Sequence, residues 1–170
     1  MLGNPQDFIA FAAARGLTVE PDDAPVALQK ATDYLNVLCW KGEVLQPDQL
    51  DCFPRINMPG YPLKDADGNV ITEQLPDDAP LPELPKPIPT KALECLYRLG
   101  MTSAEGVDLM PITEGGKQVL EERVEGAVTV RYDAGTIGAG VSLPFVDQLL
   151  EKLLECSTTS GLGNFNVYAG

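Results

Sequence analysis

The chain contains no histidine among its 170 residues. Histidine is the most frequent general base and metal ligand in proteins, so its absence excludes every nucleophile that a neighbouring imidazole activates. Basic residues are also scarce, because 12 Lys and Arg stand against 25 Asp and Glu and give a formal net charge of −13. A sequence-specific grip on duplex DNA needs clustered Lys and Arg against phosphates, so this charge disfavours that function.

The spacing of the cysteines disfavours a zinc-binding protein, and the lengths of the apolar runs disfavour a membrane-spanning one. The cysteines are too far apart for a Cys-x-x-Cys pair, so no structural zinc site is expected; they are Cys39, Cys52, Cys95 and Cys156. We predict that all four are reduced thiols packed as small hydrophobic residues, as in a cytosolic protein. The first residues lack the basic and apolar regions of a signal peptide, and no run approaches the ~18 apolar residues of a membrane span.

The composition nevertheless suits a folded protein, since 44% of the residues are hydrophobic. The fold class that we predict is mainly α, a small helical bundle with a β-hairpin, a long Pro-rich loop and an extended C-terminal tail. A single domain is expected over residues 1–156, with the Pro-rich insertion at 43–90 and the tail at 157–170.

Four segments carry apolar residues at the three- and four-residue spacing of helices. The first helix is expected from the cap Asn4 and Pro5 to Gly16, and the second from Asp22 or Asp23 towards Trp40, stopping at Lys41–Gly42. The third is expected from Pro89 to Gly100. The fourth has its cap near Ser142 and buried positions as far as Leu154. A β-hairpin is expected from Val119 to Tyr132, with its turn at Glu125–Gly126.

The segment between Glu43 and Thr90 differs from the rest, because it holds 10 of the 15 prolines. Proline fixes φ and lacks an N–H donor, so no helix or central strand is expected there. Asp65–Asn69 predicts a tight turn between short strands at 61–63 and 70–72. A long ordered loop of this kind is often a contact element.

None of the local motifs supports catalysis or metal binding. Asp65-Ala66-Asp67-Gly68 is similar to part of a calcium loop, but in that frame the first ligand would be Leu63 and the twelfth Gln74. The glycines between 135 and 140 lack the dinucleotide-binding spacing, and pairs of carboxylates on so acidic a chain are typical of solvated surface. We therefore expect no enzyme, no cofactor, and no catalytic or metal-binding residue.

Four residues of the Pro-rich region are candidates for a subunit interface: Arg55, Tyr61, Leu63 and Val70. The guanidinium of Arg55 suits a charge-assisted contact with a carboxylate of a neighbour, although pairing within its own chain is the favoured alternative. Trp40 is expected to pack the loop against the second helix.

An ordered set of short segments resembles one family of tailed-bacteriophage proteins. The segments are Phe8–Gly16, Lys30–Leu35, Trp40–Gly42, Phe53–Arg55, Ile88–Ala92, Val124–Tyr132 and Leu143–Leu150. In their order and spacing the chain resembles the head–tail connector, or adaptor, proteins, a family often catalogued as DnaT-like single-stranded-DNA-binding phage proteins. The Pro-rich insertion between Met58 and Pro87 departs from the usual pattern of that family.

The resemblance implies a structural virion protein of the neck, made in the cytoplasm of a bacterial host and assembled as a twelve-fold ring of copies beneath the portal. Such a ring docks a tail or stopper protein, contacts no membrane, and extends a channel through which genomic DNA passes without sequence-specific binding. We expect the C-terminal tail to contact the portal protein, as an added strand, through Leu162, Phe165, Val167 and Tyr168.

The alternative is a single-stranded-DNA-binding or replication-associated protein, as the catalogue name suggests. Such proteins combine a basic groove with stacking aromatic side chains. Only 6% of this chain is aromatic, and its basic residues form no cluster in the sequence.

Overall fold

The computed structural model describes residues 1–110, the two strands at 121–124 and 128–131, and residues 143–156. The fold is mainly helical, as predicted, and the described part also contains two small antiparallel strand pairs. The elements are α1 (Pro5–Ala13), α2 (Asp23–Asn36), β1 (Glu43–Val44), β2 (Arg55–Ile56), α3 (Thr90–Ala104), β3 (Glu121–Val124), β4 (Val128–Arg131) and α4 (Pro144–Leu150). No helix in the described part of the chain is long and apolar enough to cross a membrane.

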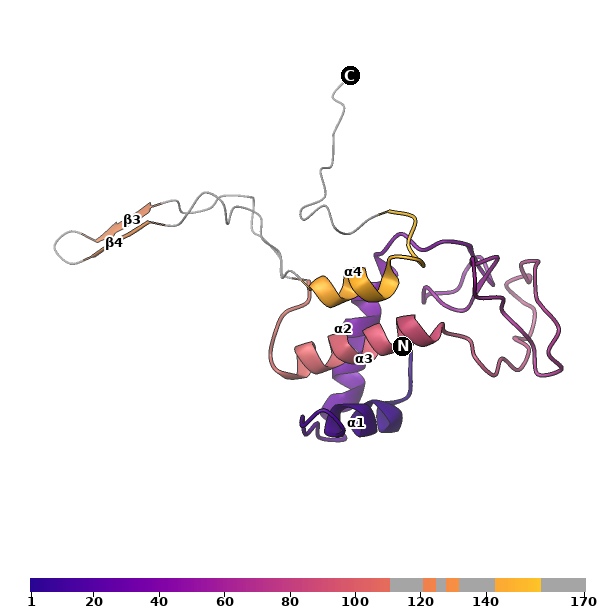
Figure 1. Cartoon of the computed structure of the whole chain (residues 1–170), viewed down its shortest axis with the longest axis horizontal. Coiled ribbons are helices and arrows are strands. Elements are labelled where there is room, and N and C mark those ends of the chain that lie inside the picture. Colours follow the sequence, from indigo (N-terminus) through magenta and orange to yellow (C-terminus); the bar gives the residue numbers. More distant parts are fainter. Residues whose placement is uncertain (111–120, 125–127, 132–142, 157–170) are drawn as a thin grey trace, which may run out of the picture.

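Helix α3 lies at the centre of the bundle and packs against α1, α2 and α4 (Figure 1). The apolar stripes that define the four helices meet in one core, whose fully buried members include Phe8, Leu28, Leu35, Leu96 and Leu150. Burial of these side chains is the main stabilising term of the bundle.

The first helix begins as its sequence predicts. The Asn4 side chain is the N-cap, and its Oδ1 accepts hydrogen bonds from the backbone N–H groups of Gln6 and Asp7, at 2.8 and 3.2 Å. Pro5 occupies the first turn, where its missing N–H costs no hydrogen bond. Gly16 follows the helix with a φ of 81°, a conformation that suits glycine.

Three of the predicted helix ends are wrong. Helix α4 stops at Leu150, so Leu153 and Leu154, which were expected on its buried side, are buried in the turn that follows it. Helix α2 stops at Asn36 and does not run on to Trp40, whose indole Nε1 donates a hydrogen bond of 2.7 Å to the Leu35 carbonyl. Helix α3 continues through Gly100, where a Cβ would lie 2.9 Å from Cε2 of Phe8. This glycine therefore allows two helices to pack closely, and Gly106, with a φ of 89°, follows the end of α3.

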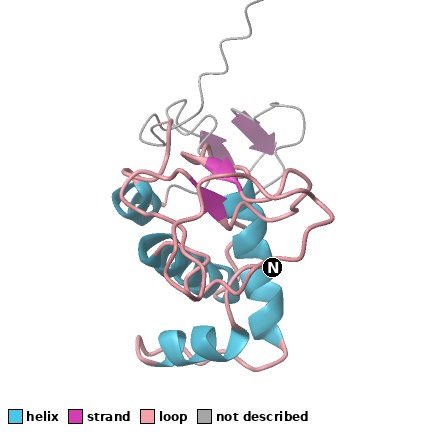
Figure 2. Cartoon of the chain, turned by 90° about the vertical axis from the view of Figure 1, so that its right-hand side faces the viewer, coloured by secondary structure: helices cyan, strands magenta, loops and turns pink. Residues whose placement is uncertain are grey.

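The Pro-rich segment folds as a lobe beside the bundle, visible as pink loops around two magenta strands in Figure 2. Strands β1 and β2, which the sequence did not predict, pair Glu43 with Ile56 and Val44 with Arg55. The lobe has a small core of its own, made of Leu45, Ile56 and Leu63, with Ile71, Leu75 and Leu84 packed against it.

The predicted turn at 65–69 is present in this lobe. An isolated bridge joins Lys64 to Val70, and the Ile71 N–H donates to the Leu63 carbonyl at 2.9 Å. The flanking segments pair without forming the full strands that were expected, and Pro62, in the first of them, has no N–H to donate. The predicted hairpin is confirmed as β3 and β4, whereas its turn and the cap near Ser142 lie outside the described residues.

Two cysteines correct the expectation of four reduced thiols. Cys39 and Cys156 form a disulfide, with Cα atoms 5.8 Å apart and a sequence separation of 117. Cys52 and Cys95 are free and buried, as predicted. The pairing arises because the segment after α2 runs beside the segment after α4, which local spacing does not reveal.

Candidate functional site

Tyr61 lies between two hollows at the junction of the lobe and the bundle. Its hydroxyl is 2.8 Å from the carbonyl oxygen of Lys86 and 2.8 Å from that of Ile88, so its proton is shared between two acceptors just before α3. Partial burial raises the pKa of the Tyr61 hydroxyl, which therefore stays protonated at neutral pH and fastens the lobe to the chain that enters α3.

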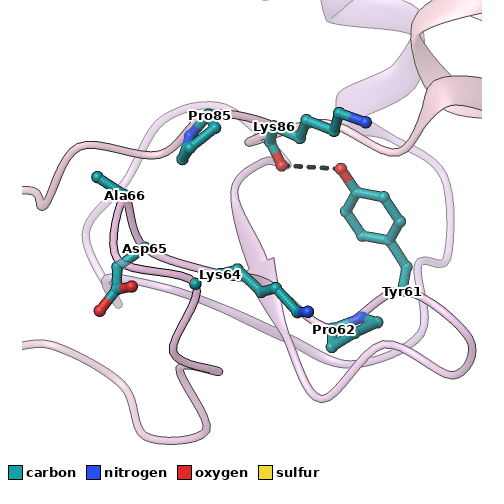
Figure 3. Close-up of a pocket in the computed structure, with 8 residues that line it drawn as sticks. Tyr61, Pro62, Lys64, Asp65, Ala66, Pro85 and Lys86 are labelled. Carbon is teal, nitrogen blue, oxygen red and sulfur yellow. Dashed lines mark hydrogen bonds between the residues drawn. The ribbon is translucent and has the colours of Figure 1, made fainter.

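The first hollow is a cavity of about 360 Å³ inside the lobe (Figure 3). It is lined by Tyr61, Pro62, Lys64, Asp65, Ala66, Gly68, Pro85 and Lys86. Both lysines are exposed and have no ion-pair partner among the described residues. The cavity therefore combines a tyrosine and proline wall with two unpaired positive charges.

The second hollow is a groove of about 460 Å³ on the other side of Tyr61. Its walls come from Pro59–Tyr61, the start of α3, the end of α4 and the residues just after it, with Leu149 and Leu153 as apolar lining. Lys91 and Lys152 add two further positive charges, of which Lys91 is paired with Glu94 at 3.2 Å. Sequence reasoning missed both hollows, because these lysines are isolated in sequence and are gathered by the fold.

The acidic turn next to the cavity is a structural turn. The carboxylate of Asp65 accepts hydrogen bonds from the Asn69 backbone N–H at 2.8 Å and from its side-chain amide at 3.1 Å. The side-chain bond and then the backbone bond lower the pKa of Asp65. Among the described residues, no group of three potential ligands is placed to hold a metal ion.

The four candidate interface residues lie in the lobe, in different environments. The Leu63 side chain is 1% exposed in the small core, and the Tyr61 hydroxyl is engaged with its own chain. Val70 is 51% exposed and is free to contact a partner. The four tail residues that we expect to contact a portal protein, Leu162, Phe165, Val167 and Tyr168, lie outside the described residues.

Arg55 makes its contacts within its own chain, as the favoured alternative expects. Its guanidinium donates to the carbonyls of Lys41 at 3.0 Å and Gly42 at 2.6 Å, with longer bonds to those of Trp40 at 3.3 Å and Cys52 at 3.5 Å. Desolvation lowers its pKa from the ordinary value. Arg55 thus connects residues 40–42, where the chain enters the lobe, to Cys52, which lies just before β2.

The two free thiols predict a loss of stability in mild alkali. Burial raises the pKa of Cys52 and that of Cys95 to about 12, above the ordinary value of 9.0. Above pH 9 the folded thiols keep protons that the unfolded thiols lose, so unfolding releases protons and stability falls as pH rises. We expect the free energy of unfolding to fall by about 1.5 kcal/mol between pH 8 and 9.5 from these two groups.

Urea denaturation of the wild type and of the double variant Cys52→Ala/Cys95→Ala, at both pH values, measures this contribution. The double variant is less stable at pH 8, because it loses buried volume, but its stability should change less with pH. An equal fall in both proteins would show that the thiols do not cause it.

The fold and the two hollows define a small, mainly helical protein with a Pro-rich lobe fastened to its bundle. The chain belongs to the family described as "Putative DnaT-like ssDNA binding protein", whose model matches residues 4–168. This confirms the family name that accompanied the sequence resemblance, while the head–tail connector identity stays a prediction. No curated protein and no solved structure matches the chain.

Proposed function

We propose that the chain is a structural subunit of a bacteriophage virion, an adaptor that forms a twelve-fold ring beneath the portal and has no catalytic activity. The observation that carries this proposal is the Pro-rich lobe. It has its own core, and it presents apolar side chains to solvent: Leu50 is 95% exposed, Leu81 54% and Val70 51%. An ordered lobe with exposed apolar residues is suited to protein contacts.

Side-chain hydrogen bonds brace the lobe within its own chain. The Gln46 side-chain amide donates to the carbonyls of Pro76 and Ala79, at 3.0 and 2.8 Å, and the Gln74 amide donates to Val44 at 2.9 Å. These bonds connect distant parts of the loop. A preordered surface loses little conformational entropy on binding, which favours stable assembly.

The β3–β4 hairpin adds support from another part of the chain. Within the described part, its two strands pair only with each other. A two-stranded hairpin is marginally stable on its own in water. A neighbouring subunit or another virion protein would stabilise the hairpin by adding a strand or by packing against it.

The charge of the chain agrees with a conduit through which DNA slides. A net charge of −13 repels phosphates, so a ring of such subunits can surround DNA without gripping it. Under this proposal, tail or stopper proteins dock on the ring, and the protein reaches the virion neck after synthesis in the host cytoplasm.

Deleting residues 157–170 should abolish binding to the portal and leave the bundle folded, because the described core ends before them. Co-sedimentation with purified portal rings measures docking, and circular dichroism with a thermal melt checks the fold. A matched control replaces the same residues with a Gly/Ser segment of equal length, which should fail to dock as well. Docking by the truncated protein at wild-type strength would refute the proposed role of the tail.

A second candidate function is binding of single-stranded DNA, and the family description favours it. The described basic residues that suit phosphates best are Lys64, Lys86 and Lys152, because they surround the two hollows beside Tyr61. Stacking is less well served, since every aromatic side chain in the described residues is buried or half-buried.

A fluorescence anisotropy titration with oligo(dT) at two salt concentrations separates the two candidates. The adaptor proposal expects weak binding that Lys64→Glu/Lys86→Glu changes little. Tight, salt-sensitive binding that this variant abolishes, and that the control Lys30→Glu on the exposed face of α2 retains, would establish the second function.

A further inference from the structure

The disulfide joins two exposed cysteines at a seam between distant segments. Cys39 follows α2, and Cys156 follows α4 and immediately precedes residues 157–170. Both cysteine residues are exposed, in contrast to the buried Cys52 and Cys95. The pair therefore lies at the surface, where small thiols in solution approach it.

Backbone hydrogen bonds hold the same seam without the help of the sulfur atoms. The Glu155 N–H donates to the Cys39 carbonyl at 2.8 Å, and the Lys41 N–H donates to the Leu153 carbonyl at 2.9 Å. Between these bonds, Trp40 and Leu154 form an antiparallel bridge. This short ladder keeps the two cysteines side by side when the bond between them is open.

Residues 40 and 41, which form one side of this ladder, are also held by contacts with other parts of the chain. The Trp40 indole is bonded to the Leu35 carbonyl, and its ring packs on Phe53 at a centroid distance of 4.7 Å. The Arg55 guanidinium holds the carbonyls of Trp40 and Lys41. Cys39 therefore stands on a rigid support, and closure of the bond orders mainly the strand that carries Cys156.

We propose that Cys39 and Cys156 form a reversible thiol–disulfide exchange site, which reacts with small thiols and disulfides of the glutathione class. In opening, a small thiolate attacks one sulfur and forms a mixed disulfide, and the other cysteine leaves as a thiolate and takes a proton. A second small thiolate then releases the first cysteine. Two small thiols become one small disulfide, and the protein disulfide becomes two thiols; closing is the reverse.

The site sets how firmly the start of the C-terminal segment is held to the bundle. In a reducing cytosol the pair is open, because glutathione keeps exposed thiols reduced, and the ladder alone holds Leu153–Glu155. In an oxidising medium the bond closes and fixes Cys156, the residue from which the 157–170 segment departs. This inference does not depend on the function proposed above.

The test is a titration of the full-length protein, without denaturant, in buffers with increasing ratios of reduced to oxidised glutathione. Acid quenching, alkylation and peptide mass analysis report each cysteine. We expect Cys39 and Cys156 to become alkylated together over one transition, with Cys52 and Cys95 unmodified in the folded protein. The variant Cys52→Ala should show the same transition. In Cys39→Ser, Cys156 has no partner in the chain, so at every ratio it should be either a free thiol or a mixed disulfide with glutathione.

Hydrogen exchange of the oxidised and the reduced protein tests the local consequence. Exchange of the Glu155 N–H should accelerate at least tenfold on reduction, while the amides of α1 remain unchanged. Three results would overturn the proposal: a bond that glutathione does not open without denaturant, thiols that do not pair in oxidising buffer, or reduction that accelerates exchange throughout the bundle.

Discussion

Replacing Arg55 with alanine is expected to lower the free energy of unfolding by about 3 kcal/mol, because charge-assisted hydrogen bonds are lost and the carbonyls that they served are left unpaired. The two shortest bonds go to Gly42 and Lys41, at 2.6 and 3.0 Å, where the chain passes from the bundle into the lobe. Equilibrium unfolding in urea, followed by circular dichroism, measures the loss.

Two further variants serve as controls for the Arg55→Ala measurement. Arg55→Lys should recover only part of the loss, because an ammonium group cannot reproduce the planar fork that reaches several carbonyls. Lys30→Ala, on the exposed face of α2, should change stability by no more than about 0.5 kcal/mol. If Arg55→Ala is as stable as the wild type but fails to assemble, Arg55 acts between subunits, as its candidacy for a subunit interface implies.

Replacing Gly42 with alanine is expected to cost about 3 to 4 kcal/mol, as the sum of a left-handed backbone and a steric clash. Gly42 has a φ of 71°, and a Cβ there would collide with the carbonyl oxygen of Ile56 and approach the backbone nitrogen of Met58 to 3.0 Å. The clash is with backbone atoms at the end of β2 and in the residues that follow it, which cannot move aside as a side chain would.

Gly60 provides the matched control for Gly42. It has nearly the same φ, 74°, but nothing lies within 4 Å of its Cβ position. Gly60→Ala should therefore show the backbone cost alone, about 1 to 2 kcal/mol. Equal losses in the two variants, measured by urea unfolding, would contradict the close approach of the lobe entry to Ile56.

The helices could be predicted well because their signals are local. The Asn4 cap, Pro5 and the apolar spacing lie within a few residues of the turns that they specify. Gly100 misled the same reasoning, because a glycine that ends a helix and one that admits a neighbouring ring look alike in sequence. Only the packing of Phe8 distinguishes them.

The features at the lobe junction could not be predicted, because distant segments create them. The disulfide closes a separation of 117 positions, and the two hollows gather lysines from the loop, α3 and the end of α4. Arg55 was singled out as charged and flanked by proline, but its four carbonyl partners carry no sequence signal. The junction is therefore formed by residues that individually carry no sequence signal.

The central proposal, an adaptor ring, is tested most directly by the native mass of the full-length protein mixed with the portal of the same phage. The account predicts a complex of the portal with twelve copies of this 18.3 kDa chain, and no retention of added oligo(dT). A protein that stays free of the portal and binds oligo(dT) tightly would contradict the account and establish single-stranded DNA as its ligand.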